Sequence, residues 1–318
     1  MVYVLLILGF GLLMKGADYF VDGSANVAKL LKISPLLVGL TIVAFGTGAP
    51  EATVSIIAAL EGNVEMTLGN VVGSNILNMA LVVGVTAAIF PLQVESSTIR
   101  KEIPFTFLAS LALLVLINDQ FFHQDAENLL TPGDGIILLL FFSIFLYYVI
   151  EAARNSRDEI DEPEIEPEAT TWGKNILLTV GGLAAIVLGG FLVVESSTEI
   201  AIRFGMSETL VGLTIVAIGG SLPELMIAVT AALKKQSEIA LGNIVGSSIF
   251  NILVVLGITS MITPLIVNSK IFLDIGYMIA LTVVLFIFSR TGCRVAKLEG
   301  WALFLSYTVY LTYIIIRN

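Results

Sequence analysis

The sequence contains few charged residues. Asp, Glu, Lys and Arg make up 13% of the 318 residues, hydrophobic residues make up 57%, and the mean hydropathy is +0.96. A soluble chain of this length needs far more polar surface, so the composition excludes an ordinary soluble protein and predicts a polytopic membrane protein. The fold class must be all-α, because open strands leave their backbone groups without hydrogen-bond partners in lipid.

Cysteine and histidine are almost absent. The single cysteine, Cys293, excludes an intrachain disulfide and leaves the redox compartment open. The single histidine, His123, is expected in a loop, so no cluster of soft metal ligands is available. The N-terminus MVYVLLILGFGLLMKGADYF lacks a basic segment and a small-residue cleavage site, which favours a first membrane helix over a signal peptide.

Hydropathy predicts ten transmembrane helices. The expected spans are 2–28, 34–60, 64–91, 103–118, 134–153, 173–202, 207–233, 238–263, 271–289 and 300–316. Loops after odd-numbered spans carry Lys29, Lys32, Arg100, Lys101, Arg154, Arg157, Lys174, Lys234, Lys235, Arg290, Arg294 and Lys297, whereas the opposite face carries only Arg203, Lys270 and Arg317. The positive-inside rule therefore predicts a multi-pass protein of the cell (plasma) membrane with both termini extracellular.

The chain resembles itself at a fixed offset. SPLLVGLTIVAFGTGAPE (34–51) matches SETLVGLTIVAIGGSLPE (207–224), and LGNVVGSNILN (68–78) matches LGNIVGSSIFN (241–251). Without gaps, 26 of the 51 positions from Ser34 to Gly84 are identical to those from Ser207 to Gly257. Each unit holds five spans, and an odd number inverts the second unit in the membrane. Such inverted repeats are typical of secondary transporters.

The repeat defines the expected domain organisation. The first inverted repeat covers 1–153, an acidic cytoplasmic linker covers 154–172, and the second inverted repeat covers 173–318. The linker segment RNSRDEIDEPEIEPEATT lacks the EF-hand pattern, so a solvated linker is favoured over a calcium sensor.

Helices 2 and 7 each combine a proline with a carboxylate and are expected to be broken at the centre of the protein. Pro50 and Pro223 have no N–H to donate, so each helix is expected to be interrupted just upstream. Glu51 and Glu224 follow directly, and a carboxylate at the bilayer centre costs about 3 kcal/mol on insertion scales. Pseudo-symmetry brings the two glutamates together at mid-membrane.

Two buried carboxylates repel each other unless a cation compensates their charge. The interrupted helices also free backbone carbonyls around Ala44, Thr47, Ala217 and Gly220. Together these groups form an all-oxygen site of charge −2. Such a site suits Ca²⁺, which accepts six to eight oxygen ligands, better than Mg²⁺, which dehydrates reluctantly.

The third and eighth spans add neutral oxygen ligands. Ser74 and Asn78 lie four residues apart on one helix face, as do Ser247 and Asn251. Small polar residues also permit close helix packing, which accounts for the glycines of GNVVGSN and GNIVGSS. The Ser and Asn pairs recur together with the glutamates, which favours the ligand interpretation.

GTGAPE and GGSLPE, each followed by a GN-x-x-GS-x-x-x-N pattern, resemble the two alpha-repeats of the sodium/calcium exchanger family, within the cation/calcium exchanger superfamily and of its prokaryotic antiporter type. The resemblance spans the whole chain. It implies Na⁺-driven Ca²⁺ export by alternating access, with the first and sixth spans sliding as gates. Proton-coupled members of the superfamily carry a GN-x-x-E type motif, which this chain lacks.

The resemblance also implies ligands. Ca²⁺ would be held by Glu51, Glu224 and the carbonyls of Thr47 and Gly220. The flanking Na⁺ sites would use the Ala44 carbonyl, Ser74 and Glu51 on one side, and the Ala217 carbonyl, Ser221, Ser247 and Glu224 on the other, with Asn78 and Asn251 between them. Ca²⁺ and several Na⁺ ions would exclude one another at this fixed charge, which makes the transport an exchange.

Two residues depart from the family pattern, which is usually Gly-Thr-Ser before the Leu/Ala-Pro-Glu. Gly48 replaces a serine and Gly220 replaces a threonine, so each repeat lacks one hydroxyl. The carbonyl ligands of Ca²⁺ survive the change, whereas Na⁺ affinity, stoichiometry and the coupling ion stay open.

Three alternatives remain. A proton-coupled Ca²⁺ exchanger would use Glu51 and Glu224 as proton carriers, and a passive cation channel would need no counter-ion. An aspartyl-type membrane hydrolase would also pair two carboxylates, but it normally uses aspartates and needs no inverted repeat, so we expect no enzyme. Ca²⁺ and Na⁺ are the expected substrates and lipid the surroundings, with no cofactor, nucleic acid or obligate protein partner indicated.

Overall fold

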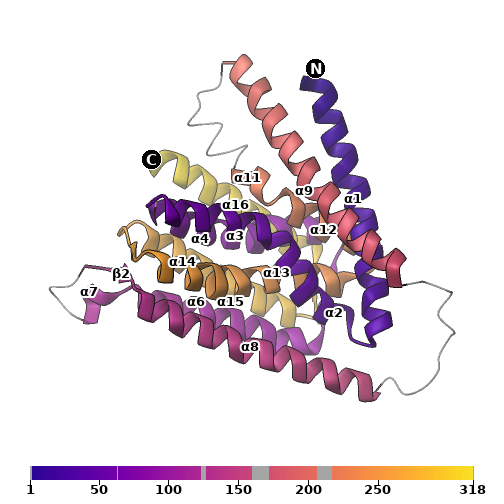
Figure 1. Cartoon of the computed structure of the whole chain (residues 1–318), viewed down its shortest axis with the longest axis horizontal. Helices are drawn as coiled ribbons and strands as arrows, with labels where there is room; N and C mark the ends of the chain where they lie inside the picture. Colours follow the sequence, from indigo (N-terminus) through magenta and orange to yellow (C-terminus); the bar gives the residue numbers. More distant parts are fainter. Residues whose placement is uncertain (1, 63, 123–126, 160–171, 206–216, 318) are drawn as a thin grey trace.

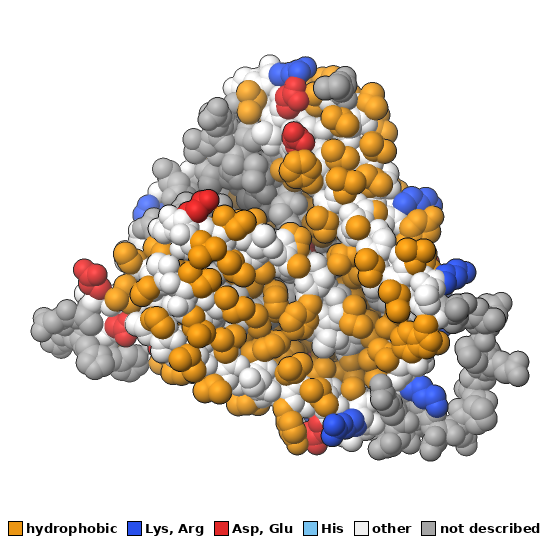
Figure 2. Space-filling view, viewed as in Figure 1, with side chains coloured by type: hydrophobic (Ala, Val, Ile, Leu, Met, Phe, Trp, Pro, Cys, Tyr) orange, Lys and Arg blue, Asp and Glu red, His pale blue; other side chains and the backbone are white. Residues whose placement is uncertain are grey.

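The computed structural model describes residues 2–62, 64–122, 127–159, 172–205 and 217–317. In these ranges eight helical segments are long and apolar enough to cross a membrane, namely Val2–Leu31, Pro35–Leu60, Thr67–Ile89, Pro132–Asn155, Trp172–Arg203, Ser237–Ile262, Ile271–Arg290 and Lys297–Arg317. Large apolar side chains cover the molecular face in Figure 2, and charged side chains lie mostly towards its edges. The chain is an all-helical, multi-pass membrane protein.

The first half comprises α1 (Val2–Leu31), α2 (Pro35–Val38), η1 (Gly39–Val43), α3 (Ala44–Leu60), α4 (Val64–Leu77), η2 (Asn78–Val82), α5 (Val83–Ile89), β1 (Leu92–Gln93), η3 (Thr98–Glu102), α6 (Ile103–Leu116), α7 (Asp119–Phe122), β2 (Leu129–Leu130) and α8 (Pro132–Glu159), where η denotes a π-helical segment. The α2 helix begins with Pro35 after the Ser34 cap, whose hydroxyl accepts the Leu37 N–H. Both residues are favourable at a helix start.

The second half comprises α9 (Trp172–Arg203), α11 (Ala217–Gly220), α12 (Leu222–Leu233), α13 (Ser237–Phe250), η5 (Asn251–Val255), α14 (Leu256–Ile262), β3 (Leu265–Ile266), α15 (Ile271–Arg290), β4 (Arg294–Val295) and α16 (Lys297–Arg317). Every residue of α13 except Glu238 is buried, so this helix lies at the centre of the bundle.

The two halves are interleaved in a pseudo-symmetric way. β1 pairs with β4 and β2 pairs with β3, each in antiparallel register, so each short sheet takes one strand from each half. The same exchange holds for helices. Gly84 of α5 lies against Gly300 of α16, and its counterpart Gly257 of α14 lies against Gly135 of α8. A Cβ at any of these glycines would meet the partner's atoms at 3.2 Å or less, so their backbones touch directly.

The long helices α1 and α9 form a separate pair beside the bundle (Figure 1). Glycines line their contact, because a Cβ added at Gly9 would lie 3.0 Å from the Gly189 oxygen and one at Gly16 would lie 2.9 Å from the Gly182 oxygen. Only 33% of the most apolar window of each helix is buried, compared with 94% for Ser237–Ile262. The pair is therefore far less enclosed than the central helices.

The expected interruption of helix 2 just upstream of Pro50 is wrong. The α3 helix begins at Ala44 and continues through this proline to Leu60. A proline removes only its own donor and crowds the carbonyl four residues back, so one missing hydrogen bond does not end the helix. The irregular stretch of this span is instead the π-helical η1, which ends at Val43.

The corresponding interruption of helix 7 is confirmed. The α11 helix ends at Gly220 and α12 begins at Leu222, with Ser221 between them in a non-helical conformation. Pro223 therefore lies in the first turn of a new helix, where its missing N–H has no intrahelical partner to lose.

Other expectations differ at their edges or fall outside the described residues. The span expected at 103–118 begins earlier, because η3 continues into α6, and the span expected at 300–316 begins at Lys297. Residues 207–216 of the seventh span, His123 and residues 160–171 of the linker lie outside the described residues.

Candidate functional site

Glu51 and Glu224 lie in the interior, where the two halves meet. Glu51 is in α3 with 7% of its surface exposed, and Glu224 is in the first turn of α12 with none exposed. The two carboxylates are close enough to interact electrostatically. Two acidic groups therefore share one buried region, and a compensating positive charge would stabilise both.

The polar neighbours of Glu51 come from two other helices and from the break between α11 and α12. Asn251 of η5 donates from Nδ2 to Glu51 Oε2 at 3.0 Å, and the Ser221 hydroxyl donates to Oε1 at 3.5 Å. Ser74 of α4 is a further polar neighbour. The helix break at Ser221 turns its hydroxyl towards the opposite repeat, so the broken helix contributes directly to the surroundings of Glu51.

A second polar cluster surrounds Thr47, one turn before Glu51. Its hydroxyl lies 3.0 Å from Asn243 Oδ1, 3.4 Å from the Ser247 hydroxyl and 3.4 Å from the Ala44 carbonyl oxygen. Ser247 also donates to Asn243 at 3.4 Å. Asn243 is not among the expected site residues, although its Gly-Asn pair recurs in both repeats and is the signal that could have found it.

Several buried oxygen atoms have no hydrogen-bond partner in the described part of the chain. They include both carboxylate oxygens of Glu224 and the amide oxygens of Asn75, Asn78 and Asn251. The Thr47 hydroxyl is also within reach of the Glu224 carboxylate, but its single hydrogen is donated to Asn243 Oδ1 at 3.0 Å. Unpaired buried oxygens are costly, and a bound hard cation would satisfy them.

Two π-helical segments begin at equivalent residues of the site. η2 begins at Asn78 and η5 begins at Asn251, which the repeat aligns with each other. Single π-helical turns within α-helices occur frequently at functional sites because they alter the local backbone hydrogen bonds. The backbone is therefore irregular at both central asparagines.

The structure brings together most, but not all, of the expected site residues. Contacts join Glu51 to Ser74, Ser221 and Asn251, and Thr47 to Ser247, the Ala44 carbonyl and the Glu224 charge. In the described ranges no contact joins Gly220 or Asn78 to either glutamate, and Ala217 is placed only as the first residue of α11. Gly220 is exposed, and Asn78 is fully buried with an unpaired amide.

A buried cluster of carboxylate, hydroxyl and amide groups between the two halves of a multi-pass helical protein is typical of a cation transporter. Comparison with known proteins gives the family. The model of the family described as "Sodium/calcium exchanger protein" matches residues 1–151 and 174–316. The chain belongs to the sodium/calcium exchanger family.

Relatives and solved structures agree with this assignment. CaxA of Alkalimonas amylolytica is 38% identical over 96% of both chains, and the sodium/calcium exchanger MaX1 of Methanosarcina acetivorans is 33% identical over 97% of both. The inner membrane protein YrbG of Escherichia coli is 34% identical over 82% of this chain and 79% of its own. The solved structure of the sodium-calcium exchanger NCX_Mj is similar with a TM-score of 0.82 and 27% identity, over 98% of both chains.

Proposed function

We propose that the protein exchanges Na⁺ for Ca²⁺ across the cell membrane by alternating access, and that the Na⁺ gradient drives Ca²⁺ export. The observation that carries the proposal is the pair Glu51 and Glu224, buried together and surrounded by oxygen ligands from both repeats. The names of the relatives MaX1 and NCX_Mj support the choice of ions.

Ca²⁺ would bind between Glu51 and Glu224, with the carbonyls of Thr47 and Gly220. One flanking Na⁺ site would use Ser74 and the Ala44 carbonyl, and the other would use Ser221, Ser247 and the Ala217 carbonyl. Asn78 and Asn251 would complete the centre, and the amide oxygens of both are free to accept a cation. These assignments would give ligand roles to the unpaired oxygens of Glu224, Asn78 and Asn251.

Exchange follows from charge and space. The two carboxylates require compensation, which one Ca²⁺ or several Na⁺ ions supply, and both sets share Glu51 and Glu224 as ligands. An ion-free site would leave two negative charges in the membrane interior, so the empty protein would change conformation slowly. The less enclosed pair α1 and α9 would slide past the bundle. The protein would have ten transmembrane helices, with both termini outside the cell.

The test is Ca²⁺ uptake into proteoliposomes loaded with Na⁺, compared with liposomes loaded with choline and with an imposed pH gradient. The proposal expects Ca²⁺ uptake to require internal Na⁺. Glu51→Gln or Glu224→Gln should abolish this uptake while the protein remains folded. Uptake driven by the pH gradient without Na⁺ would contradict it and favour a proton-coupled exchanger. Near-normal transport in either variant would refute the assigned site.

A further inference from the structure

A cavity of about 530 Å³ extends between α4, α15 and α16. Its wall includes Asn70 and Ser74 of α4 together with the exposed Asn268 and Lys270. Ser74 is a neighbour of Glu51, so the cavity connects the surface with the edge of the candidate ion site.

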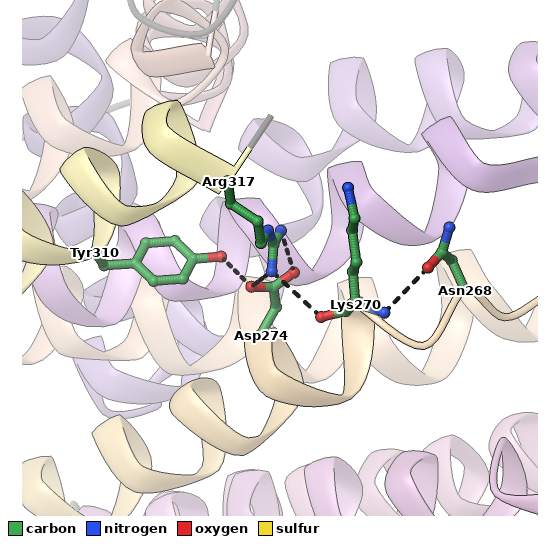
Figure 3. A network of polar contacts seen from close by, with 5 residues as sticks. All are labelled: Asn268, Lys270, Asp274, Tyr310 and Arg317. Carbon is green, nitrogen blue, oxygen red and sulfur yellow. Dashed lines mark hydrogen bonds and ion pairs between the residues drawn. The ribbon is translucent and has the colours of Figure 1, made fainter.

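Three charged residues line this cavity, namely Lys270, Asp274 and Arg317. Arg317 binds Asp274 through two hydrogen bonds of 3.0 Å, one from each terminal nitrogen to a separate carboxylate oxygen. Tyr310 donates to the same carboxylate at 3.1 Å, and Arg317 also donates to the Lys270 carbonyl at 3.3 Å. Figure 3 shows Arg317 and Tyr310, both from α16, converging on Asp274 of α15.

The first repeat contains a counterpart of this cluster without the arginine. The first three buried residues of α15 are Asp274, Ile275 and Met278. They have the same spacing as the buried residues Glu102 of η3 and Ile103 and Thr106 of α6. Glu102 accepts a hydrogen bond from Tyr148 of α8, the helix equivalent to α16. Among the described residues, no lysine or arginine forms an ion pair with Glu102, although Lys101 acts on it electrostatically and lies 5.1 Å from the centroid of the Tyr148 ring. The hydrogen bond between an acid and a tyrosine therefore recurs in both halves, whereas the direct ion pair with an arginine is found only in the second.

We propose that the pair of Asp274 and Arg317 sets the electrostatic potential of the cavity and thereby the preference for divalent over monovalent cations entering from this face. The inference rests on the proposed exchange of Na⁺ and Ca²⁺. Arg317 neutralises a carboxylate that would otherwise concentrate cations beside the route to Ser74. The electrostatic energy of an ion is proportional to its charge. A change in potential that multiplies the local Na⁺ concentration by some factor therefore multiplies the local Ca²⁺ concentration by the square of that factor.

The experiment measures the KM values for Ca²⁺ and Na⁺ added on the Arg317 face of proteoliposomes. Orientation is counted by labelling the exposed Cys293 with an impermeant maleimide. For Arg317→Gln, the KM is expected to fall about 3-fold for Na⁺ and about 9-fold for Ca²⁺. Asp274→Asn should raise both values, and the double variant should return them close to those of the wild type.

Two controls isolate the charge. Arg317→Lys keeps the charge and should change the KM values little, and Arg203→Gln removes an exposed arginine that is paired with Glu199 and is not among the residues that line the cavity. The effects should also shrink in about 1 M choline chloride, where the Debye length is roughly 3 Å.

Shifts of the two single variants in the same direction, or equal shifts for Na⁺ and Ca²⁺, would overturn the inference. If Arg317→Gln does not fold, Lys270→Gln replaces it, because Lys270 lines the same cavity and its hydrogen bond to Arg317 is made by the backbone carbonyl, and an unchanged KM in that variant would overturn the inference. A wild-type protein without Na⁺-dependent Ca²⁺ flux would instead refute the proposed function.

Discussion

Gly48 and Gly220 are the residues at which this chain departs from the pattern of its family, and the structure gives them different surroundings. A Cβ added at Gly48 would lie 3.0 Å from Cδ1 of Phe250, whose ring packs on Phe45 with the centroids 4.6 Å apart. A Cβ added at Gly220 would meet no described atom within 4 Å. The missing hydroxyl is therefore easier to restore at Gly220 than at Gly48.

Gly220→Thr should fold like the wild type and raise the apparent Na⁺ affinity about 5-fold, the effect of one hydrogen-bond-sized contact of roughly 1 kcal/mol. Gly48→Ser should instead lower stability by about 1–2 kcal/mol because Phe250 must move. Na⁺ dependence of transport and thermal unfolding measure the two effects. A destabilised Gly220→Thr, or a Gly48→Ser that is as stable as the wild type, would contradict this assignment of space.

The sequence predicted the chemistry of the site better than its hydrogen bonds. Glu51, Ser74 and Asn251 could be found because each recurs in both repeats, Ser221 was expected only from the family resemblance, and the structure brings the four together. Asn243 recurs as well, but its contact with Thr47 depends on how α13 packs against α3, which no local pattern encodes.

At the scale of helices, hydropathy predicted most spans but not their irregularities. The π-helical segments that begin at Asn78 and Asn251 add no signal to a hydrophobic pattern, and they are only visible in the backbone. The two prolines predicted a helix break in both repeats. The helix is broken only near the second proline, at Ser221, whereas α3 continues through Pro50. Tertiary packing decides which of two similar sequences keeps its helix.

The glycine contact between α1 and α9 gives a prediction about helix movement. Gly16→Ala should slow exchange at least about 10-fold, because its Cβ would lie 2.9 Å from the Gly182 oxygen and force the helices apart. Gly11→Ala is the matched control, since a Cβ there meets no described atom within 4 Å. Sided flux measurements test the pair, and equal rates in the two variants would show that close contact of α1 and α9 is not required.

At the scale of the whole molecule, a cluster of ion pairs connects α1 to the bundle. Lys234, at the end of α12, lies 2.8 Å from Asp22 and 3.4 Å from Asp18 of α1, and it donates to the Asp18 carbonyl at 2.9 Å. If α1 slides during transport, these contacts must break, so they stabilise this conformation relative to the others.

Lys234→Gln should therefore increase hydrogen exchange in α1, with a shift in conformational free energy of about 1 kcal/mol, as expected for a partly exposed ion-pair cluster. Lys235→Gln, at the neighbouring exposed position, is the control and should leave the exchange unchanged. Hydrogen exchange followed by mass spectrometry resolves α1 from the other helices. Equal exchange in both variants would mean that the cluster does not hold α1.

The central claim is that Na⁺ and Ca²⁺ compete for one pair of glutamates, and Ca²⁺ binding to the purified protein tests it most directly. As the Na⁺ concentration rises, the apparent Kd for Ca²⁺ should increase more steeply than in proportion to that concentration, because several Na⁺ ions replace one Ca²⁺. The number of Ca²⁺ sites should stay the same. Glu51→Gln should weaken Ca²⁺ binding about 100-fold, equivalent to roughly 2.7 kcal/mol, whereas Glu61→Gln, an exposed control at the end of α3, should not. A Kd for Ca²⁺ that is independent of Na⁺ would contradict the account.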